Sequence, residues 1–492
     1  MRVLCTALSV LAALCASSCA VPLGPGYTVR KQTVDVHFQP SSEARVTIEG
    51  QYLLVNTGDQ PLASLDVRLP RSGVLRLASP SIQWDGQPVP FARHEDPAGD
   101  VLHLDFAQPW PVKQSHTLTV RYDIAQGAPN TSQLDFVADS FYLPPGNAVP
   151  SLLPPRGTFS SGGAPPEKWI LTVRVPQDFL VHATGRAKHQ KKENAELRID
   201  FEQQPDDLSP FVVAGRYHVW EYHESNTTII FWKKSPPQPA ELEPFARDIA
   251  HIIQTYDSLF GPRAKHPQPI RIIDSPVPLK QWFGKFARQP DGSARIEDGM
   301  YLTLPQPDFA FLYLSKSGEL LYAREMNFLW IADSLARTWL GYGRNPEFEQ
   351  QQFPMKSLPH YAVELARESL KGPEIRGEFI AARLRGIPRD ANIEEKESEI
   401  LSRDKSLLFF FALEDQFGRD RLHTALRNMV QARRTRGYDL DDLIAALEAE
   451  ARKPVAPFVR LWLKHPGIPE EFRARYAVPA APANTAPKEN PQ

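Results

Sequence analysis

Two charged side chains interrupt the most apolar helical stretch of the sequence. The stretch 327–341 is apolar on nearly every side, so the sequence predicts a buried helix there. Asp333 and Arg337 lie in it four residues apart, a spacing that places both on one face of the helix. Burying such a pair is costly unless each partner is satisfied. Asp333 and Arg337 are therefore the first candidates for a binding or structural site.

Few nearby side chains could complete a metal site or a catalytic site. No two of the 13 histidines are four residues apart, and the sequence has no His-Glu-x-x-His motif. His360 could bind zinc together with Asp333, although a capping or packing role is the simpler interpretation. Ser334 would need a base to act as a nucleophile, and the local sequence supplies none.

The elements that must position these residues change character along the chain. Apolar and polar residues mostly alternate from about residue 27 to residue 232, which predicts a β-sandwich or saddle-shaped β domain. A proline-rich break at 235–240 follows, and helical periodicity dominates after it. Short β-like stretches at 269–273 and 300–304 lie among the helices. The predicted fold class is therefore multidomain α+β, with a mixed α/β domain followed by a C-terminal helical segment.

The predicted boundaries follow these changes of pattern. They are a signal peptide at 1–18, an anchor linker at 19–26, the N-terminal β domain at 27–233, a linker at 234–241, the mixed α/β domain at 242–385, the C-terminal helical region at 386–476 and a tail at 477–492. We expect the tail to be disordered, because it is rich in alanine and proline.

The N-terminus has the features of an export signal. Met1 and Arg2 precede an apolar run at 3–16, which is too short to span a membrane. The sequence Ala16-Ser17-Ser18-Cys19 resembles the lipobox of bacterial lipoproteins, in which the cysteine is acylated and becomes the mature N-terminus. We therefore expect an exported protein of the bacterial cell envelope or periplasm, anchored by lipidated Cys19 and placed most simply at the outer membrane. Ordinary cleavage near Ala20 is the alternative.

Three further stretches are informative by their order as well as by their residues. They are Leu208-Ser-Pro-Phe-Val-Val-Ala-Gly-Arg-Tyr217, Ala336-Arg-Thr-Trp-Leu-Gly341 and Phe458-Val-Arg-Leu-Trp-Leu-Lys-His-Pro-Gly-Ile-Pro469. The first stretch resembles the strand that ends the N-terminal domain of the M1 family of zinc aminopeptidases. The second resembles the end of that family's His-Glu-x-x-His-x-Trp-x-Gly motif. The third resembles the family's closing Trp-x-x-x-x-Gly-x-Pro. The resemblance covers about residues 27 to 470. It implies a thermolysin-like peptidase fold for 242–385.

The resemblance also implies where the catalytic residues of that family would lie. Its first zinc-binding His falls at Asp333, its general-base Glu at Ser334 and its second His at Arg337. Its third ligand, a Glu, falls at Lys356, and its oxyanion-stabilising Tyr at Arg403. All five positions are replaced in this sequence. Arginine and protonated lysine offer no lone pair to Zn²⁺, and their charges repel it, so zinc is expected to be absent.

The position that would bind the substrate's amino group is less closely fixed. It falls in the stretch 295–300, at either Ile296 or Glu297, and we take Glu297 as the candidate substrate-binding residue.

These observations favour a catalytically inactive M1-like protein that serves as a binding or scaffold module, without a cofactor. Two alternatives are an active M1-type hydrolase with a non-standard site and a structural assembly subunit that uses its β domain. The charged side chains that stand at the replaced positions could bind a peptide or an anion. They could also simply satisfy one another and tie helices together, as zinc does in the family. The formal net charge of −2 argues against a nucleic-acid partner. The expected partners are a peptide or protein of the envelope and the membrane that holds the lipid anchor.

Overall fold

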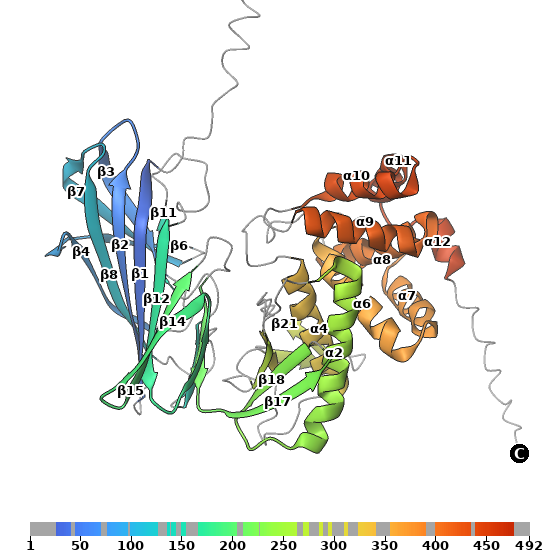
Figure 1. Ribbon diagram of the computed structural model, residues 1–492. Helices are drawn as coiled ribbons and strands as arrows, with labels where there is room; N and C mark the ends of the chain where they lie inside the picture. Colours follow the sequence, from blue (N-terminus) through green and yellow to red (C-terminus); the bar gives the residue numbers. More distant parts are fainter. Residues whose placement is uncertain are drawn as a thin grey trace, which may run out of the picture. The chain divides into compact units, whose positions relative to one another are not determined.

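The computed structural model of the chain consists of two compact units. The first comprises Met1–Tyr217 and Pro276–Tyr301, and the second His218–Ser275 and Leu302–Gln492. The N-terminal unit is rich in β-strands and the C-terminal part is helical, which confirms the predicted α+β class (Figure 1). The structure describes residues 26–40, 45–69, 76–96, 99–125, 135–137, 139–143, 149–153, 166–203, 210–225, 227–262, 269–274, 285–288, 294–297, 309–312, 323–340, 355–389, 399–433 and 438–476.

The first unit is built from antiparallel and mixed sheets. Its largest sheet contains, in order, β14 (Arg186–Glu193), β15 (Glu196–Gln203), β12 (Lys168–Pro176), β1 (Tyr27–Gln39), β2 (Arg45–Asn56), β8 (Ser115–Ala125), β4 (Arg76–Trp84) and β5 (Gln87–Pro88). A second sheet contains β13 (Leu180–Ala183), β16 (Val212–Gly215), β10 (Ser140–Leu143) and β9 (Asp135–Val137). A third contains β11 (Ser151–Leu153), β3 (Leu62–Arg68), β7 (Gly99–Trp110) and β6 (Ala92–Asp96). A hairpin of β20 (Lys285–Arg288) and β21 (Ala294–Glu297) also groups with this unit.

The alternation seen in the sequence is what forms the core of this unit. In β1, Val34, Val36 and Phe38 are buried while the residues between them are only partly covered. Because successive side chains of a strand point to opposite faces, this pattern gives the strand one apolar face. The apolar faces of all three sheets contribute to one hydrophobic cluster. The first unit therefore has a core of its own, as an independent domain requires.

The second unit begins with a sheet whose first two strands fall within the N-terminal β domain predicted from the sequence. Strands β17 (His218–Glu224), β18 (Thr227–Lys233), β19 (Ile270–Asp274) and β22 (Phe309–Leu312) form one sheet, in which β18, β19 and β22 run parallel. The predicted β domain continues to residue 233, whereas the compact unit ends at Tyr217. The difference arises because β17 and β18 alternate like the preceding strands but find their partners later in the chain. Periodicity reports a strand but not the strand it pairs with.

Helices make up the rest of the second unit. They are α2 (Pro239–Phe260), α4 (Ala323–Trp339), the 3₁₀ turn η1 (Met355–Ser357), α6 (Leu358–Lys371), α7 (Glu374–Gly386), α8 (Glu399–Phe417), α9 (Arg419–Ala432), α10 (Leu440–Ala451), α11 (Ala456–Lys464) and α12 (Glu470–Arg475). The residues predicted as a linker at 234–241 include the first turn of α2, which starts at Pro239 because proline suits the first helical position.

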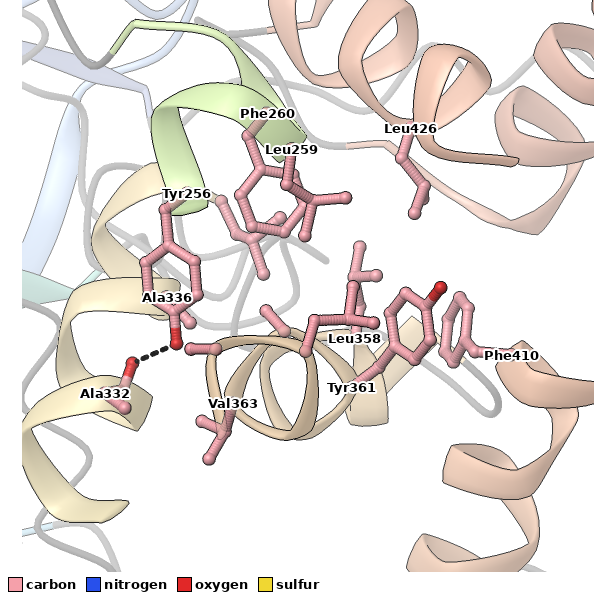
Figure 2. Packing of buried hydrophobic residues seen from close by; sticks show 14 of the residues in the cluster. Tyr256, Leu259, Phe260, Ala332, Ala336, Leu358, Tyr361, Val363, Phe410 and Leu426 are labelled. Atoms are coloured by element: carbon pink, nitrogen blue, oxygen red, sulfur yellow. Dashed lines mark hydrogen bonds between the residues drawn. The ribbon is translucent and has the colours of Figure 1, made fainter. Parts of the chain in front are cut away.

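Helices α2, α4 and α6 share a buried interface that fixes the position of the candidate site. Figure 2 shows Tyr256 and Leu259 of α2, Ala332 and Ala336 of α4 and Tyr361 of α6 in the same cluster. The hydroxyl of Tyr256 donates to the backbone oxygen of Ala332 over 2.9 Å, so α2 is joined to α4 by a polar contact inside the core. Ile331, Ala332, Leu335 and Ala336 of α4 are fully buried, as expected for a helix that is apolar on nearly every side.

Several expectations fall on residues that the structure does not describe. The signal peptide at 1–18, Cys19, most of the anchor linker and the tail at 477–492 lie outside the described residues. Within the described part of the chain, no helix is both long enough and apolar enough to cross a bilayer.

Candidate functional site

The charged pair predicted on α4 forms a direct ion pair. The Nε atom of Arg337 donates to Oδ2 of Asp333 over 2.7 Å, and its Nη2 atom lies 3.4 Å from Oδ1. The helix is held on either side of the pair by apolar packing, and Trp339 Nε1 donates to Asp257 of α2 over 3.0 Å. The side chain of Arg337 is only 10% exposed and that of Asp333 only 23%. The pair is therefore part of the interior of the unit.

A histidine from α6 completes the environment of Asp333. The Nδ1 atom of His360 lies 3.4 Å from Oδ1 of Asp333. Burial is the main reason that the pKa of His360 falls to about 4; Asp333 opposes this shift, and Arg337 and Arg403 add to it. His360 is therefore neutral near pH 7.

Asp333 keeps its negative charge in this setting. Burial opposes ionisation of its carboxyl group, but Arg337, His360 and Arg403 outweigh burial and hold the pKa below its ordinary value. Arg403, in the first turns of α8, is close enough to influence the pKa of both Asp333 and His360, and its Nε atom lies 3.8 Å from Oδ1 of Asp404. We call Asp333, Arg337, His360 and Arg403 the Asp333 cluster.

The backbone near Arg403 is anchored to η1, which carries Lys356. The hydroxyl of Ser357 donates to the backbone oxygen of Arg403 over 3.1 Å. Next to Arg403, Asp404 accepts from Nη1 of Arg383 over 3.0 Å. The contact of Ser357 holds η1, which includes Lys356, against the start of α8, which includes Arg403.

The structure places the other predicted site residues in different surroundings. Lys356 is exposed and makes no hydrogen bond or ion pair with Asp333. Ser334 is partly buried, and no base among the described residues is hydrogen-bonded to its hydroxyl. Glu297 lies on β21, opposite Lys285, in a hairpin that groups with the first unit. Cys19 lies outside the described residues. Of the predicted positions, Asp333 and Arg337 are joined by a direct contact, and Arg403 stabilises the charge of Asp333 electrostatically.

The sequence interpretation did not single out a second buried acid on α6. Glu364 lies one helical turn after His360, and its side chain is 12% exposed. Burial raises its pKa to about 7, although Arg367 and Arg383 favour its charged form. The spacing of four residues between His360 and Glu364 could have indicated that both lie on one face of a helix.

The chemistry available to a metal ion here is limited. Within the part of the chain that the structure describes, no group of three or more His, Cys, Asp or Glu side chains is arranged to hold a metal. The potential metal ligands that lie close together here are His360 and Asp333, and both carboxylate oxygens of Asp333 already face Arg337.

Comparison with solved structures indicates the same architecture in zinc peptidases. The chain is similar to the M1 zinc metallopeptidase of Deinococcus radiodurans, with a TM-score of 0.53 and 14% identity over 90% of this chain and 95% of that one. It is similar to a variant of that enzyme bound to a Tyr-Ser-Ala substrate, with a TM-score of 0.52, 14% identity and coverage of 90% and 96%. It also resembles Legionella pneumophila aminopeptidase A in complex with aspartic acid, with a TM-score of 0.55 and 14% identity, but it spans only 50% of that chain.

These likenesses establish an M1-aminopeptidase-like fold. No model of a known protein family matches the sequence, and no curated protein matches it at the level of sequence. The likeness in fold therefore carries no information about activity.

Proposed function

We propose that this protein is a catalytically inactive, M1-aminopeptidase-like protein of the bacterial cell envelope that acts as a binding or scaffold module. The observation that carries the proposal is the ion pair between Asp333 and Arg337. In the resemblance to the M1 family these two positions correspond to the two zinc-binding histidines. Here they satisfy each other within α4.

The donor set supports an inactive site because it does not fit Zn²⁺. Zinc in a catalytic site needs three protein ligands and an open position. Arg337 brings a permanent positive charge, and the carboxylate of Asp333 already accepts from it. Ser334 cannot replace the carboxylate that acts as general base in the M1 family. We therefore derive no hydrolytic step for this protein.

The same geometry supports a structural role for the charges. Asp333 contacts Arg337 on its own helix and His360 on α6, and its charge is stabilised by Arg403 of α8. Side chains of α4, α6 and α8 thus act on one carboxylate; α4 and α6 belong to residues 242–385, which we propose to form a thermolysin-like domain, and α8 to the helical region that follows it. A protein tie of this kind can do for the helices what zinc does in the M1 family.

An assay of peptide hydrolysis tests the proposal. The purified mature protein, incubated with Zn²⁺ and short peptides with free amino termini, should release no amino-terminal residue. Release that depends on zinc would contradict the proposal.

A restored variant makes this negative result informative. It combines Asp333→His, Ser334→Glu, Arg337→His and Lys356→Glu, and it should bind zinc if these positions are the lost ligands and base. A folded variant that binds no zinc would contradict the assignment of these four positions.

We propose further that Cys19 anchors the protein to a membrane after export. The lipobox-like sequence before Cys19 and the short apolar run at 3–16 support this proposal. Expression of Cys19→Ser should move the protein from the membrane fraction to the soluble fraction, and mass spectrometry of the wild-type N-terminus should find an acylated cysteine. An unmodified N-terminus near Ala20 would instead support ordinary cleavage.

A further inference from the structure

A second polar site lies in the helical unit, away from the Asp333 cluster. Helices α2, α6 and α9, with the turn between α6 and α7, line an open cavity of about 640 Å³. Cavities that bind small molecules are typically about 300–1,000 Å³. None of the four residues of the Asp333 cluster lines this cavity. Its size therefore permits a ligand that would not touch the candidate M1-like site.

Three basic residues of α9 face the cavity at helical spacing. Arg419, His423 and Arg427 are four residues apart in turn and all line the wall. Arg419 is engaged, because its Nη1 and Nη2 atoms donate to the two oxygens of Glu368 over 2.8 and 2.5 Å. Its Nε atom also lies 3.3 Å from Oε2 of Glu414.

Arg427 is not neutralised in this way. Its Nε atom donates to the backbone oxygen of Ser258 over 3.0 Å, and its Nη2 atom contacts the same oxygen. No carboxylate of the described residues lies within ion-pair distance of its guanidinium group. Because Arg has five N–H donors, several remain for a ligand. The cavity wall thus carries one surplus positive charge.

The hydrogen bonds of His423 fix which of its ring nitrogens can accept. The hydroxyl of Tyr361 donates its single hydrogen to Glu414, so its oxygen accepts from Nε2 of His423, 3.0 Å away. Burial and Arg419 lower the pKa of His423 to about 4, so the ring is neutral near pH 7. A neutral ring protonated at Nε2 has a lone pair on Nδ1. Nδ1 has no hydrogen-bond partner among the described residues.

The remaining wall suits the body of a small organic molecule. Thr255 and Ser369 place hydroxyl groups 3.2 Å apart at one side of the cavity; these donate to the backbone oxygens of His251 and Ala366, so toward a ligand they act mainly as acceptors. Leu259 and Leu365 provide apolar surface. The lining thus combines a cationic side chain, a neutral imidazole, two hydroxyl groups and apolar surface, which is the usual composition of a small-molecule site.

We propose that this cavity binds a small organic anion that also carries a hydroxyl or ammonium group, with Arg427 contacting the anionic group and Nδ1 of His423 accepting from the donor. A carboxylate and a phosphate ester share the anionic chemistry that a guanidinium group recognises. Neither the charge nor the acceptor depends on zinc or on the Asp333 cluster. The site can therefore exist whether or not the protein is a peptidase.

Isothermal titration calorimetry at constant ionic strength tests the proposal with matched ligands. The probes are L-malate, L-glutamate and glucose 6-phosphate, with succinate and inorganic phosphate as anions that lack a hydroxyl or ammonium group on a carbon skeleton. At least one of the three probes should bind the wild-type protein, and succinate should bind more weakly than L-malate if malate is the one that binds. The proposal would be overturned if none of the three probes bound. It would also be overturned if L-malate bound and succinate bound equally tightly.

Two variants on the same helix separate the cavity from surface charge. Arg427→Gln should weaken binding about tenfold or more, the loss expected for one charge-assisted contact. Arg421→Gln is the matched control, because Arg421 is exposed and does not line the cavity. Equal weakening by both variants would overturn the proposal by attributing binding to the general charge of α9.

Discussion

The helical unit contains two polar clusters, and two neighbouring residues of α6 contribute one side chain to each. The two clusters are nevertheless built differently. His360 belongs to the Asp333 cluster, while Tyr361 belongs to a group that we call the Glu414 network, which consists of Tyr361, Glu368, Arg376, Glu414, Arg419 and His423. In the Glu414 network two carboxylates face two guanidinium groups. In the Asp333 cluster one carboxylate contacts one guanidinium group, that of Arg337, and is stabilised by a second, that of Arg403.

The comparison shows that the two clusters compensate their buried charges differently. A balanced network with a fully buried carboxylate is typical of a structural core, since each charge is compensated where it lies. In the Asp333 cluster the second guanidinium group, that of Arg403, also lies 3.8 Å from Asp404, so an acid outside the cluster shares its charge.

Removing the central acid of the Glu414 network should have the largest effect on stability. The side chain of Glu414 is 1% exposed, and it contacts Tyr361, Arg376 and Arg419. Glu414→Ala removes the buried carboxylate that Tyr361 and Arg376 contact and should lower the free energy of unfolding by about 4 kcal/mol. Urea unfolding of Glu414→Ala and of Glu378→Ala, an exposed residue of α7, provides the measurement and its control. Equal stability of the two variants would contradict the assigned role of the network.

Breaking the ion pair of the Asp333 cluster should have a somewhat smaller effect. Arg337→Ala leaves Asp333 with His360 and Arg403, and because Asp333 is 23% exposed, water can compensate part of its charge. We expect a loss of about 3 kcal/mol in the free energy of unfolding. Arg421→Ala serves as a surface control. An unchanged melting temperature for Arg337→Ala would show that the pair does not tie the helices together.

A pH series should reveal the buried acid beside the Asp333 cluster. Burial raises the pKa of Glu364 from 4.5 to about 7, so the folded state holds this proton more tightly than the unfolded state. Its contribution to stability is therefore fully present below pH 4.5 and is lost as the pH rises through 7. His360, whose pKa is lowered, gives the opposite slope, but that slope cancels when two proteins that both contain His360 are compared.

The variant Glu364→Gln removes the titrating group. Its stability relative to the wild type should increase by about 2 kcal/mol between about pH 5 and about pH 8. Urea unfolding at both values measures the difference. A difference that stays constant with pH would contradict the raised pKa.

Lys356 should contribute least, which sharpens the boundary of the cluster. Its side chain is exposed, so Lys356→Gln should change the free energy of unfolding by no more than about 1 kcal/mol, the range of a surface interaction. Thermal unfolding of this variant beside Arg337→Ala gives the comparison. A loss as large as that of Arg337→Ala would mean that Lys356 belongs to the tie after all.

The sequence predicts elements and local pairs better than it predicts long-range partners. The pairing of Asp333 with Arg337 follows from a spacing of four residues, and most helix bounds from Leu358 onward follow from helical periodicity. His360 and Arg403 join the pair only because α6 packs against both α4 and α8, which no local pattern encodes. For the same reason the sequence did not reveal that β17 and β18 pair within the second unit, or that Glu364 would be buried.

The zinc content of the purified wild-type protein tests the central claim most directly. The claim is that Asp333 and Arg337 bind each other where the M1 family binds its metal. After equilibration with Zn²⁺ and removal of loosely bound ions, elemental analysis should find only substoichiometric zinc, and zinc should leave the melting temperature unchanged. Stoichiometric zinc that is lost in Asp333→Asn would contradict the account.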